Sequence, residues 1–161
     1  TIIIPRHIDR SEKIVQDLKK ENLKVLLHNQ LDQINDDTDI LLVNAYGETL
    51  KFYQIVKCVF LGKSLIQSLK NDGGQNPIEP ARLGCKIFHG PYTSNFNEVY
   101  QFLNSLNISY KITDPKILGK LITEELSKEK VVDEFVIKKI ESYGANTFNN
   151  VLKEINIYIN S

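Results

Sequence analysis

The chain has few of the residues from which metal centres are built. Its 161 residues include only two cysteines and three histidines. A structural zinc site needs more ligands at closer spacing. Cys58 and Cys85 each lie in or beside an apolar run, as small core residues of a reducing compartment do. We therefore expect free core cysteines and no bound metal.

Net charge and long apolar runs are also missing. The 20 basic and 20 acidic residues cancel, so bulk electrostatics predicts no binding to nucleic acid. No apolar stretch approaches the length that crosses a bilayer, and no signal peptide is visible, so we expect a soluble fragment. A content of 42% hydrophobic and 25% charged residues fits one globular domain over residues 1–161.

Common nucleotide and hydrolase motifs are absent as well. Gly62-Lys63-Ser64 ends like a P-loop, but Lys57 stands where that motif needs glycine. No G-x-G-x-x-G fingerprint occurs, and the histidines have no serine in a nucleophile-elbow setting. These absences exclude a P-loop, the usual dinucleotide site and a hydrolase triad.

The sequence does contain a regular alternation of short apolar strands and helices. The predicted strands cover residues 1–4, 24–27, 39–43, 58–61, 85–88 and 109–112. Predicted helices begin near Asp9, cover about 46–56, and begin again near Pro77 and Asn95. The tail over 114–161 reads as wholly helical. This order predicts an α/β fold with a Rossmann-like, doubly wound parallel sheet covered on both faces.

One segment carries most of the functional information: Asp72-Gly73-Gly74-Gln75-Asn76-Pro77-Ile78-Glu79-Pro80. Asn76 can cap a helix, Pro77 suits the first helical position, and Glu79 follows three residues after the cap. The preceding glycines let a backbone approach a phosphate or sugar, and a helix dipole favours an anion. The segment predicts either a ligand-binding helix N-terminus or a capped surface helix in which Glu79 bonds its own backbone.

The remaining motifs follow strands. They cover residues 5–10, 44–48, 62–75 and 90–94. In parallel sheets, ligands bind beyond the carboxyl ends of the strands. We therefore expect these loops to share one edge and to form a nucleotide site there.

Taken together, the motifs resemble a known family. They are Ile4-Pro5-Arg6-His7, Asn44-Ala45-Tyr46-Gly47-Glu48, Gly62-Lys63-Ser64, the segment from Gly73 to Glu79, and Gly90-Pro91-Tyr92-Thr93-Ser94-Asn95-Phe96. In content and order they resemble the C-terminal half of the 3-deoxy-D-manno-octulosonic acid (Kdo) transferases. These are GT-B glycosyltransferases that use CMP-Kdo to glycosylate the lipid A precursor. The resemblance covers roughly residues 1–110.

The resemblance implies a set of donor-binding residues. The CMP-binding residues would be Pro5, Arg6, Tyr46, Gly47, Glu48, Asn76, Pro77, Ile78 and Glu79, with Ser64, Gly73, Gly74 and Gln75 as further donor contacts. Arg6 would bind the phosphate or stack on cytosine, and Glu79 would accept hydrogen bonds from the ribose hydroxyls. The alternatives are a surface Arg6 that pairs with Asp9 or Glu12, and a Glu48 that only favours a helix N-terminus.

Four departures from the family pattern affect this site. The family usually has Gly-Gly-Ser in place of Gly62-Lys63-Ser64, histidine in place of Gln75 and of Tyr92, and a shorter loop than residues 65–72. Glutamine and tyrosine keep hydrogen-bonding capacity, but they are neither cations nor proton donors near neutrality. The resemblance therefore implies donor binding here without a proton-transferring role for these two positions.

The implied function is donor binding in a metal-independent transfer of Kdo from CMP-Kdo to the lipid A precursor, lipid IVA. This step of lipopolysaccharide biosynthesis would occur at the cytoplasmic face of the inner membrane of a Gram-negative bacterium. By the same resemblance, the acceptor site, the membrane attachment and the glutamate that acts as general base would belong to an N-terminal domain that this chain does not include. We expect no catalytic residue here and an inactive fragment. The alternatives are a GT-B domain that uses a UDP-sugar, and a non-catalytic module that binds nucleotide or protein.

Overall fold

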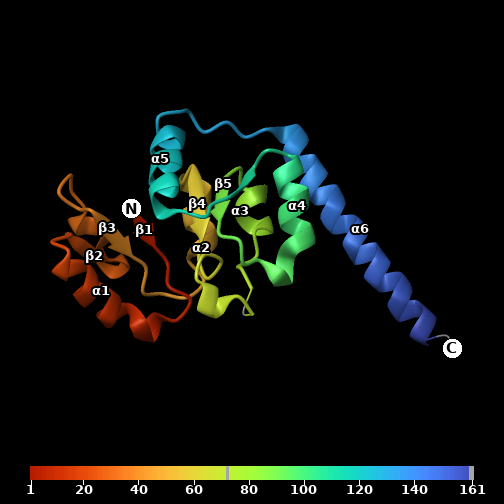
Figure 1. The fold of residues 1–161 in the computed structure, drawn as a ribbon, viewed down its shortest axis with the longest axis horizontal. Coiled ribbons are helices and arrows are strands. Elements are labelled where there is room, and N and C mark those ends of the chain that lie inside the picture. Colours follow the sequence, from red (N-terminus) through yellow and green to blue (C-terminus); the bar gives the residue numbers. More distant parts are fainter. Residues whose placement is uncertain (72, 160–161) are drawn as a thin grey trace. The chain divides into compact units, whose positions relative to one another are not determined.

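The computed structural model describes residues 1–71 and 73–159, so Asp72 of the glycine segment lies outside the described residues. The chain forms two compact units, Thr1–Phe52 and Tyr53–Ser161. Each unit contains a three-stranded sheet, and all strand pairs are parallel (Figure 1). The predicted parallel α/β architecture is confirmed, with the strands divided between two sheets.

The first unit is built around its central strand. Its strands are β1 (Ile2–Ile3), β2 (Val25–Leu27) and β3 (Ile40–Leu42), in the order β1-β3-β2. All residues of β3 are buried, as expected for an apolar run between two parallel neighbours. Helix α1 (Ser11–Lys20) follows a 3₁₀ turn, and a further 3₁₀ segment covers His28–Gln33. Leu41, Val43 and Phe52 form the buried core of this unit.

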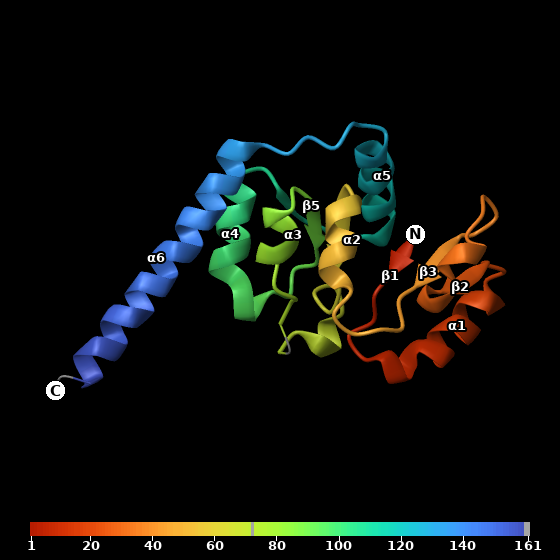
Figure 2. The ribbon, with the colours of Figure 1, turned by 180° about the vertical axis from the view of Figure 1, so that it is seen from behind.

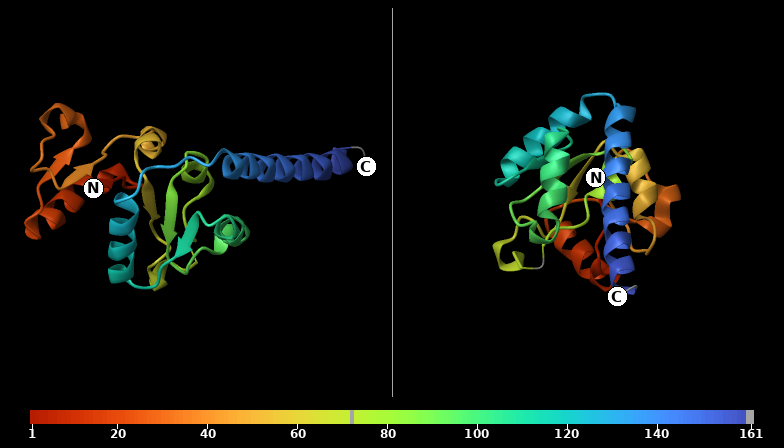
Figure 3. Two further views of the ribbon diagram at one scale, coloured as in Figure 1. Left: turned by 90° about the horizontal axis from the view of Figure 1, so that it is seen from above. Right: turned by 90° about the vertical axis from the view of Figure 1, so that its right-hand side faces the viewer.

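The second unit also has a three-stranded parallel sheet, with a different strand order and more helices. Its strands are β4 (Cys58–Leu61), β5 (Lys86–His89) and β6 (Ser109–Lys111), in that order. Its helices are α3 (Ile78–Arg82), α4 (Asn97–Ser105), α5 (Pro115–Leu126) and α6 (Glu134–Ile159), with 3₁₀ turns at Gln67–Leu69 and Ser94–Phe96. Helix α5 lies on one side of the sheet and α3 and α4 lie on the other (Figure 3). This sheet is therefore covered on both faces.

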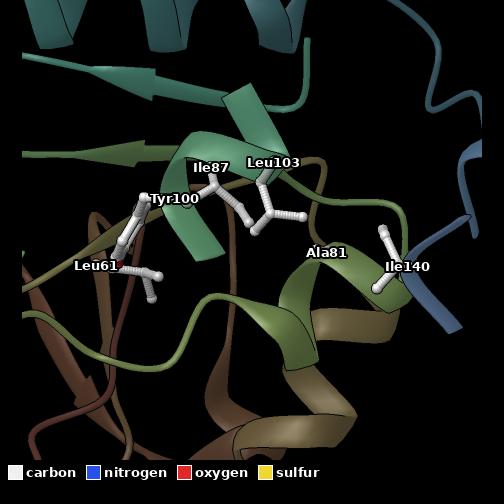
Figure 4. Close-up of a cluster of buried hydrophobic side chains, with 6 residues drawn as sticks. All are labelled: Leu61, Ala81, Ile87, Tyr100, Leu103 and Ile140. Carbon is white, nitrogen blue, oxygen red and sulfur yellow. The ribbon is translucent and has the colours of Figure 1, made fainter. Parts of the chain in front are cut away.

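The core of the second unit combines side chains of β4, β5, α3, α4 and α6. It contains Leu61, Ala81, Ile87, Tyr100, Leu103 and Ile140 (Figure 4). Ile140 is 1% exposed and is the buried residue of α6. Beyond it, α6 continues as one straight helix (Figure 2), with Phe148, Val151, Leu152 and Ile155 exposed. The first turns of α6 therefore anchor the helix to the unit.

Several helix boundaries differ from the expected ones. Helix α2 (Thr49–Ile55) begins later than residue 46, because Gly47 has a left-handed backbone with φ of 81°. The helix expected from Asn95 begins at Asn97, after the 3₁₀ turn. The tail is helical but is interrupted between α5 and α6. Asp133 Oδ1 accepts from the amides of Phe135 (2.9 Å) and Val136 (3.3 Å) and so caps the second helix.

Two lysines cap helix ends that lack a capping glycine. Lys57 Nζ donates to the carbonyl of Leu126 at 2.8 Å, at the end of α5, and to that of Lys128. Lys130 Nζ donates to the carbonyls of Tyr53 (3.2 Å) and Gln54 (3.1 Å), in the last turn of α2. An ammonium group satisfies carbonyls that have no helical partner and complements the negative end of the dipole. These contacts tie the segment after α5 to α2 and β4.

Candidate nucleotide-binding site

Two of the predicted segments lie at one edge of the first sheet. Arg6 follows β1, and Tyr46 to Glu48 follow β3; these strands are parallel neighbours, with Ile2 paired to Leu41. Tyr46 is 69% exposed and Gly47 is also exposed. The topology therefore brings these predicted contacts to the same edge of this unit.

Arg6 forms no ion pair with any residue that the structure describes. The residue is exposed, and no carboxylate among the described residues forms an ion pair with its guanidinium. The alternative interpretation, a surface arginine paired with Asp9 or Glu12, is not observed. A planar donor group that is exposed and unpaired is suited to a phosphate or to the face of a base.

Glu48, in contrast, is already engaged. Its carboxylate lies 2.8 Å from Lys51 Nζ and 4.0 Å from His28 Nε2, and its carbonyl accepts from the amide of Lys51 at 3.1 Å, where α2 begins. The hydrogen bond from Lys51 lowers the pKa of this carboxyl, against an opposing effect of desolvation. The His28 ring packs edge-on against buried Phe52 with centroids 5.7 Å apart. The carbonyl of Glu48 thus accepts a hydrogen bond at the start of α2. A ligand that binds the carboxylate would have to compete with Lys51 and His28.

In the second unit, Ser64 joins the loops that follow β4 and β5. Its hydroxyl donates to the carbonyl of Leu61 at 2.6 Å and accepts from the amide of Gly90 at 2.8 Å. Its carbonyl accepts from the amide of Tyr92, also at 2.8 Å. Ser64 is 0% exposed. The structure therefore gives Ser64 a scaffolding part, and direct contact with a donor stays a prediction.

The close approach of these loops explains why Gly90 is a glycine. A Cβ on Gly90 would lie 2.1 Å from the carbonyl oxygen of Ser64 and 2.5 Å from Leu65 Cα. No side chain fits there without displacement of the backbone. Glycine at this position is required by protein packing, whether or not a ligand binds.

Gly73, Gly74 and Gln75 also pack against the protein. A Cβ on Gly73 would meet the side chain of Asn95 at 2.4 Å, and one on Gly74 would meet the Tyr100 hydroxyl at 3.3 Å. The Tyr100 hydroxyl donates to the carbonyl of Gln75 at 2.9 Å. We expected these glycines to let the backbone approach a ligand. In the structure, the side chains of Asn95 and Tyr100 occupy the space next to these glycines.

The predicted cap at Asn76 is present. Asn76 Oδ1 accepts from the amide of Ile78, the first residue of α3, at 3.0 Å, and so satisfies an amide that has no partner within the helix. Glu79 is exposed, and within the described part of the chain it forms no hydrogen bond with the amide of Asn76. The capping-box interpretation of Glu79 is therefore not supported. Because α3 has only five residues, its dipole adds little for an anion.

Three residues near this segment, His89, Tyr53 and Tyr100, were not predicted from the sequence as site residues. His89 ends β5 and is 5% exposed; its Nδ1 lies 2.7 Å from the carbonyl of Gly90. Its ring packs on that of Tyr100 with centroids 4.1 Å apart. Burial lowers the pKa of His89, with Lys111 adding to the effect and the bond to Gly90 opposing it.

Tyr53 lies near Glu79, and burial together with that carboxylate raises the pKa of Tyr53. In the sequence, Tyr100 stands three residues before Leu103 on an apolar helix face. This spacing indicates core packing and gives no sign of the hydrogen bond to Gln75.

The predicted site residues thus form two groups, one in each unit. Arg6 and Tyr46 to Glu48 belong to the first unit, and Ser64 and Gly73 to Glu79 belong to the second. That all of them bind one nucleotide stays a prediction. Among the described residues, no group of three or more histidines, cysteines and carboxylates is placed to hold a metal ion. No helix in the described ranges combines the length and apolar character needed to cross a membrane.

Comparison with known proteins supports the family resemblance. The chain is 30% identical over 102 residues to the 3-deoxy-D-manno-octulosonic acid transferase of Haemophilus influenzae, which covers 63% of this chain and 23% of that protein. It is 31% identical over 163 residues to a bifunctional glycosyltransferase/methyltransferase of Fusobacterium nucleatum, which covers 99% of this chain and 24% of that protein. No family model matches the chain.

A solved structure supports the fold. The chain aligns with the C-terminal CMP-Kdo binding domain of WaaA from Acinetobacter baumannii at a TM-score of 0.74 and 23% identity, over 88% of this chain and 71% of that one. The resemblance predicted from the motifs is confirmed: the chain is similar in sequence to Kdo transferases and has the fold of this C-terminal domain. The chain spans about a quarter of the length of the first two curated relatives.

Proposed function

We propose that this chain, which is similar in sequence to Kdo transferases, binds CMP-Kdo as the donor domain of a longer glycosyltransferase. The observation that carries the proposal is the agreement of two likenesses, one of sequence to named Kdo transferases and one of fold to a CMP-Kdo binding domain. Transfer of Kdo to the lipid A precursor, at the cytoplasmic face of the inner membrane and without a metal, is part of the same proposal. The acceptor site and the general base would lie elsewhere in the longer protein.

The geometry supports separate roles for the residues. Glu79 is exposed and is not used as a helix cap, so its two carboxylate oxygens are available to accept from ribose hydroxyls. Asn76 holds the start of α3 through the amide of Ile78. Arg6, which is exposed and forms no ion pair with a described residue, would bind the phosphate or stack on the cytosine, and stabilise the phosphate as it leaves.

The proposal is tested by titrating the 161-residue chain with CMP and following its amide resonances. A domain that buries only part of the donor binds weakly, at roughly the millimolar scale or above, which corresponds to about 4 kcal/mol. Shifts should cluster at Arg6, Gly47 and Asn76 to Glu79. Shifts confined to residues after Asp114 would show that the site is elsewhere.

Glu79→Gln tests the ribose role directly. Glutamine offers one acceptor oxygen in place of a carboxylate, so CMP binding should weaken by about 1 to 3 kcal/mol. Glu98→Gln is the matched control, because Glu98 is also exposed in the first turn of a helix. Equal CMP affinities for the two variants would remove Glu79 from the site.

A second candidate is a glycosyltransferase domain that uses a different nucleotide-sugar. The Fusobacterium relative, which aligns with 99% of this chain, has a name that specifies neither the sugar nor the nucleotide. CMP, UMP and UDP should therefore be compared in the same titration. Preference for CMP supports Kdo transfer, whereas preference for UDP favours the UDP-sugar alternative. If none of the three binds, nucleotide binding by this chain is contradicted, and a module that binds protein is the interpretation that is left.

A further inference from the structure

We infer that Tyr100 and His89 form a positioning pair that fixes the Gln75–Glu79 segment for the donor, an inference that rests on the proposed function. Neither residue is among the predicted donor contacts. Both are buried side chains of the second unit, Tyr100 on α4 and His89 at the end of β5. Their contacts lead from the centre of the sheet to the residue before Asn76.

Tyr100 holds the chain immediately ahead of the cap. Its ring is part of the core cluster, and the residue is 3% exposed. Its hydroxyl donates to the carbonyl of Gln75 at 2.9 Å. Gly74 packs so closely that an added Cβ would lie 3.3 Å from that hydroxyl. The position of Gln75 is therefore set by a core side chain, and the rest of the loop has a separate anchor at Ser64.

His89 holds the Tyr100 ring in turn. The carbonyl of Gly90 is an acceptor, so the proton of the neutral His89 ring lies on Nδ1, and the 2.7 Å bond fixes the ring plane. The ring centroids of His89 and Tyr100 are 4.1 Å apart, with the planes at 41°. Displacement of the histidine would therefore shift the tyrosine and the carbonyl it holds.

This arrangement matters for binding because α3 is too short to hold itself. A five-residue helix has one turn and does not nucleate independently. Residues that are ordered before the ligand arrives lose little further conformational entropy on binding. Tyr100 supplies that order through one hydroxyl, which a tyrosine-to-phenylalanine change removes while it keeps the ring.

The test compares Tyr100→Phe with Tyr110→Phe. Tyr110 is the matched control, because its hydroxyl also donates to a loop carbonyl, that of Asn107 at 2.6 Å, away from the Gln75–Glu79 segment. Two properties are measured on each folded variant: ¹⁵N relaxation of residues 74–79 without ligand, and the CMP dissociation constant. We expect Tyr100→Phe to increase motion in 74–79 and to weaken CMP binding about three- to tenfold. Tyr110→Phe should change neither property.

A purely structural role would lower the thermal midpoint of both variants and leave relaxation and affinity unchanged; that result overturns the inference. His89→Phe keeps an aromatic ring but loses the bond to Gly90, and it should also increase motion in 74–79. Unchanged motion in this variant would remove His89 from the pair. Failure of the unaltered chain to bind CMP would overturn the proposed function, while the relaxation arm would still decide whether the pair positions the segment.

Discussion

Replacing Gly90 with alanine tests how tightly the loops after β4 and β5 are joined. The added Cβ would lie 2.1 Å from the Ser64 carbonyl oxygen and 2.4 Å from the carbonyl carbon. Both are backbone atoms, so no side-chain rotation relieves the contact. The loop at Ser64 must move by about 1 Å to restore an ordinary carbon–oxygen separation, which a close-packed interior resists.

The cost follows from the contacts that such a movement breaks. Overpacking alone costs about 1–3 kcal/mol. Ser64 also accepts hydrogen bonds from the amides of Gly90 and Tyr92, each 2.8 Å long. Each bond contributes about 0.5–1.5 kcal/mol to the free energy of unfolding. We therefore expect Gly90→Ala to lower the free energy of unfolding of the second unit by roughly 2–6 kcal/mol.

The assay is a urea titration followed through the amide resonances of Ile87 and Leu103, which are buried in that unit. Gly62→Ala is the control, since no atom lies within 4 Å of its added Cβ, and it should change the free energy by less than about 0.5 kcal/mol. If the two variants unfold at the same urea concentration, that result would contradict the close packing of Gly90 against the Ser64 backbone described above.

Three further predictions concern other parts of the second unit. Ile140→Ala should cost about 2–5 kcal/mol in the same urea assay, whereas Ile155→Ala, at an exposed position of the same helix, should cost little; equal losses would contradict the described anchoring of α6. Gly119→Ala, inside α5 and with no atom within 4 Å of its added Cβ, should raise the free energy of unfolding by about 0.5–1 kcal/mol, and a decrease would mean that α5 is not helical there. Because burial lowers the pKa of His89 below 6.5, the unfolded chain binds this proton at higher pH than the folded one. Stability should therefore fall as pH falls below about 6.5, and His89→Phe should reduce that slope; an unchanged slope would exclude His89 as its cause.

The sequence predicted well what depends on local patterns. The apolar run at β3 indicated a buried parallel strand, and Asn76 was identified as a helix cap from its position ahead of Pro77. Both features are set by residues within one or two turns of each other. The same local reasoning explains why α2 was expected about three residues too early, because the left-handed conformation of Gly47 is a backbone choice that the sequence permits without requiring.

The sequence predicted less of what depends on distant contacts. Ser64 and Gly90 are 26 residues apart, and Tyr100 is 25 residues from Gln75. Nothing in the local pattern shows that Gly73 and Gly74 admit Asn95 and Tyr100, so these glycines were interpreted as room for a ligand. The sequence likewise could not show that Arg6 forms no ion pair with a described residue, because Asp9 and Glu12 stand close to it along the chain.

The lysine caps at the ends of α2 and α5 have a consequence for how the chain reaches its native state. Lys57 is 69 residues from Leu126, and Lys130 is 77 residues from Tyr53. Loops of this length close late, after the local turns have formed. The last turns of both helices should therefore be completed only when the strands between them are assembled. During synthesis, α2 would lack its ammonium cap until residue 130 has left the ribosome, although its own sequence would have been available for more than seventy residues.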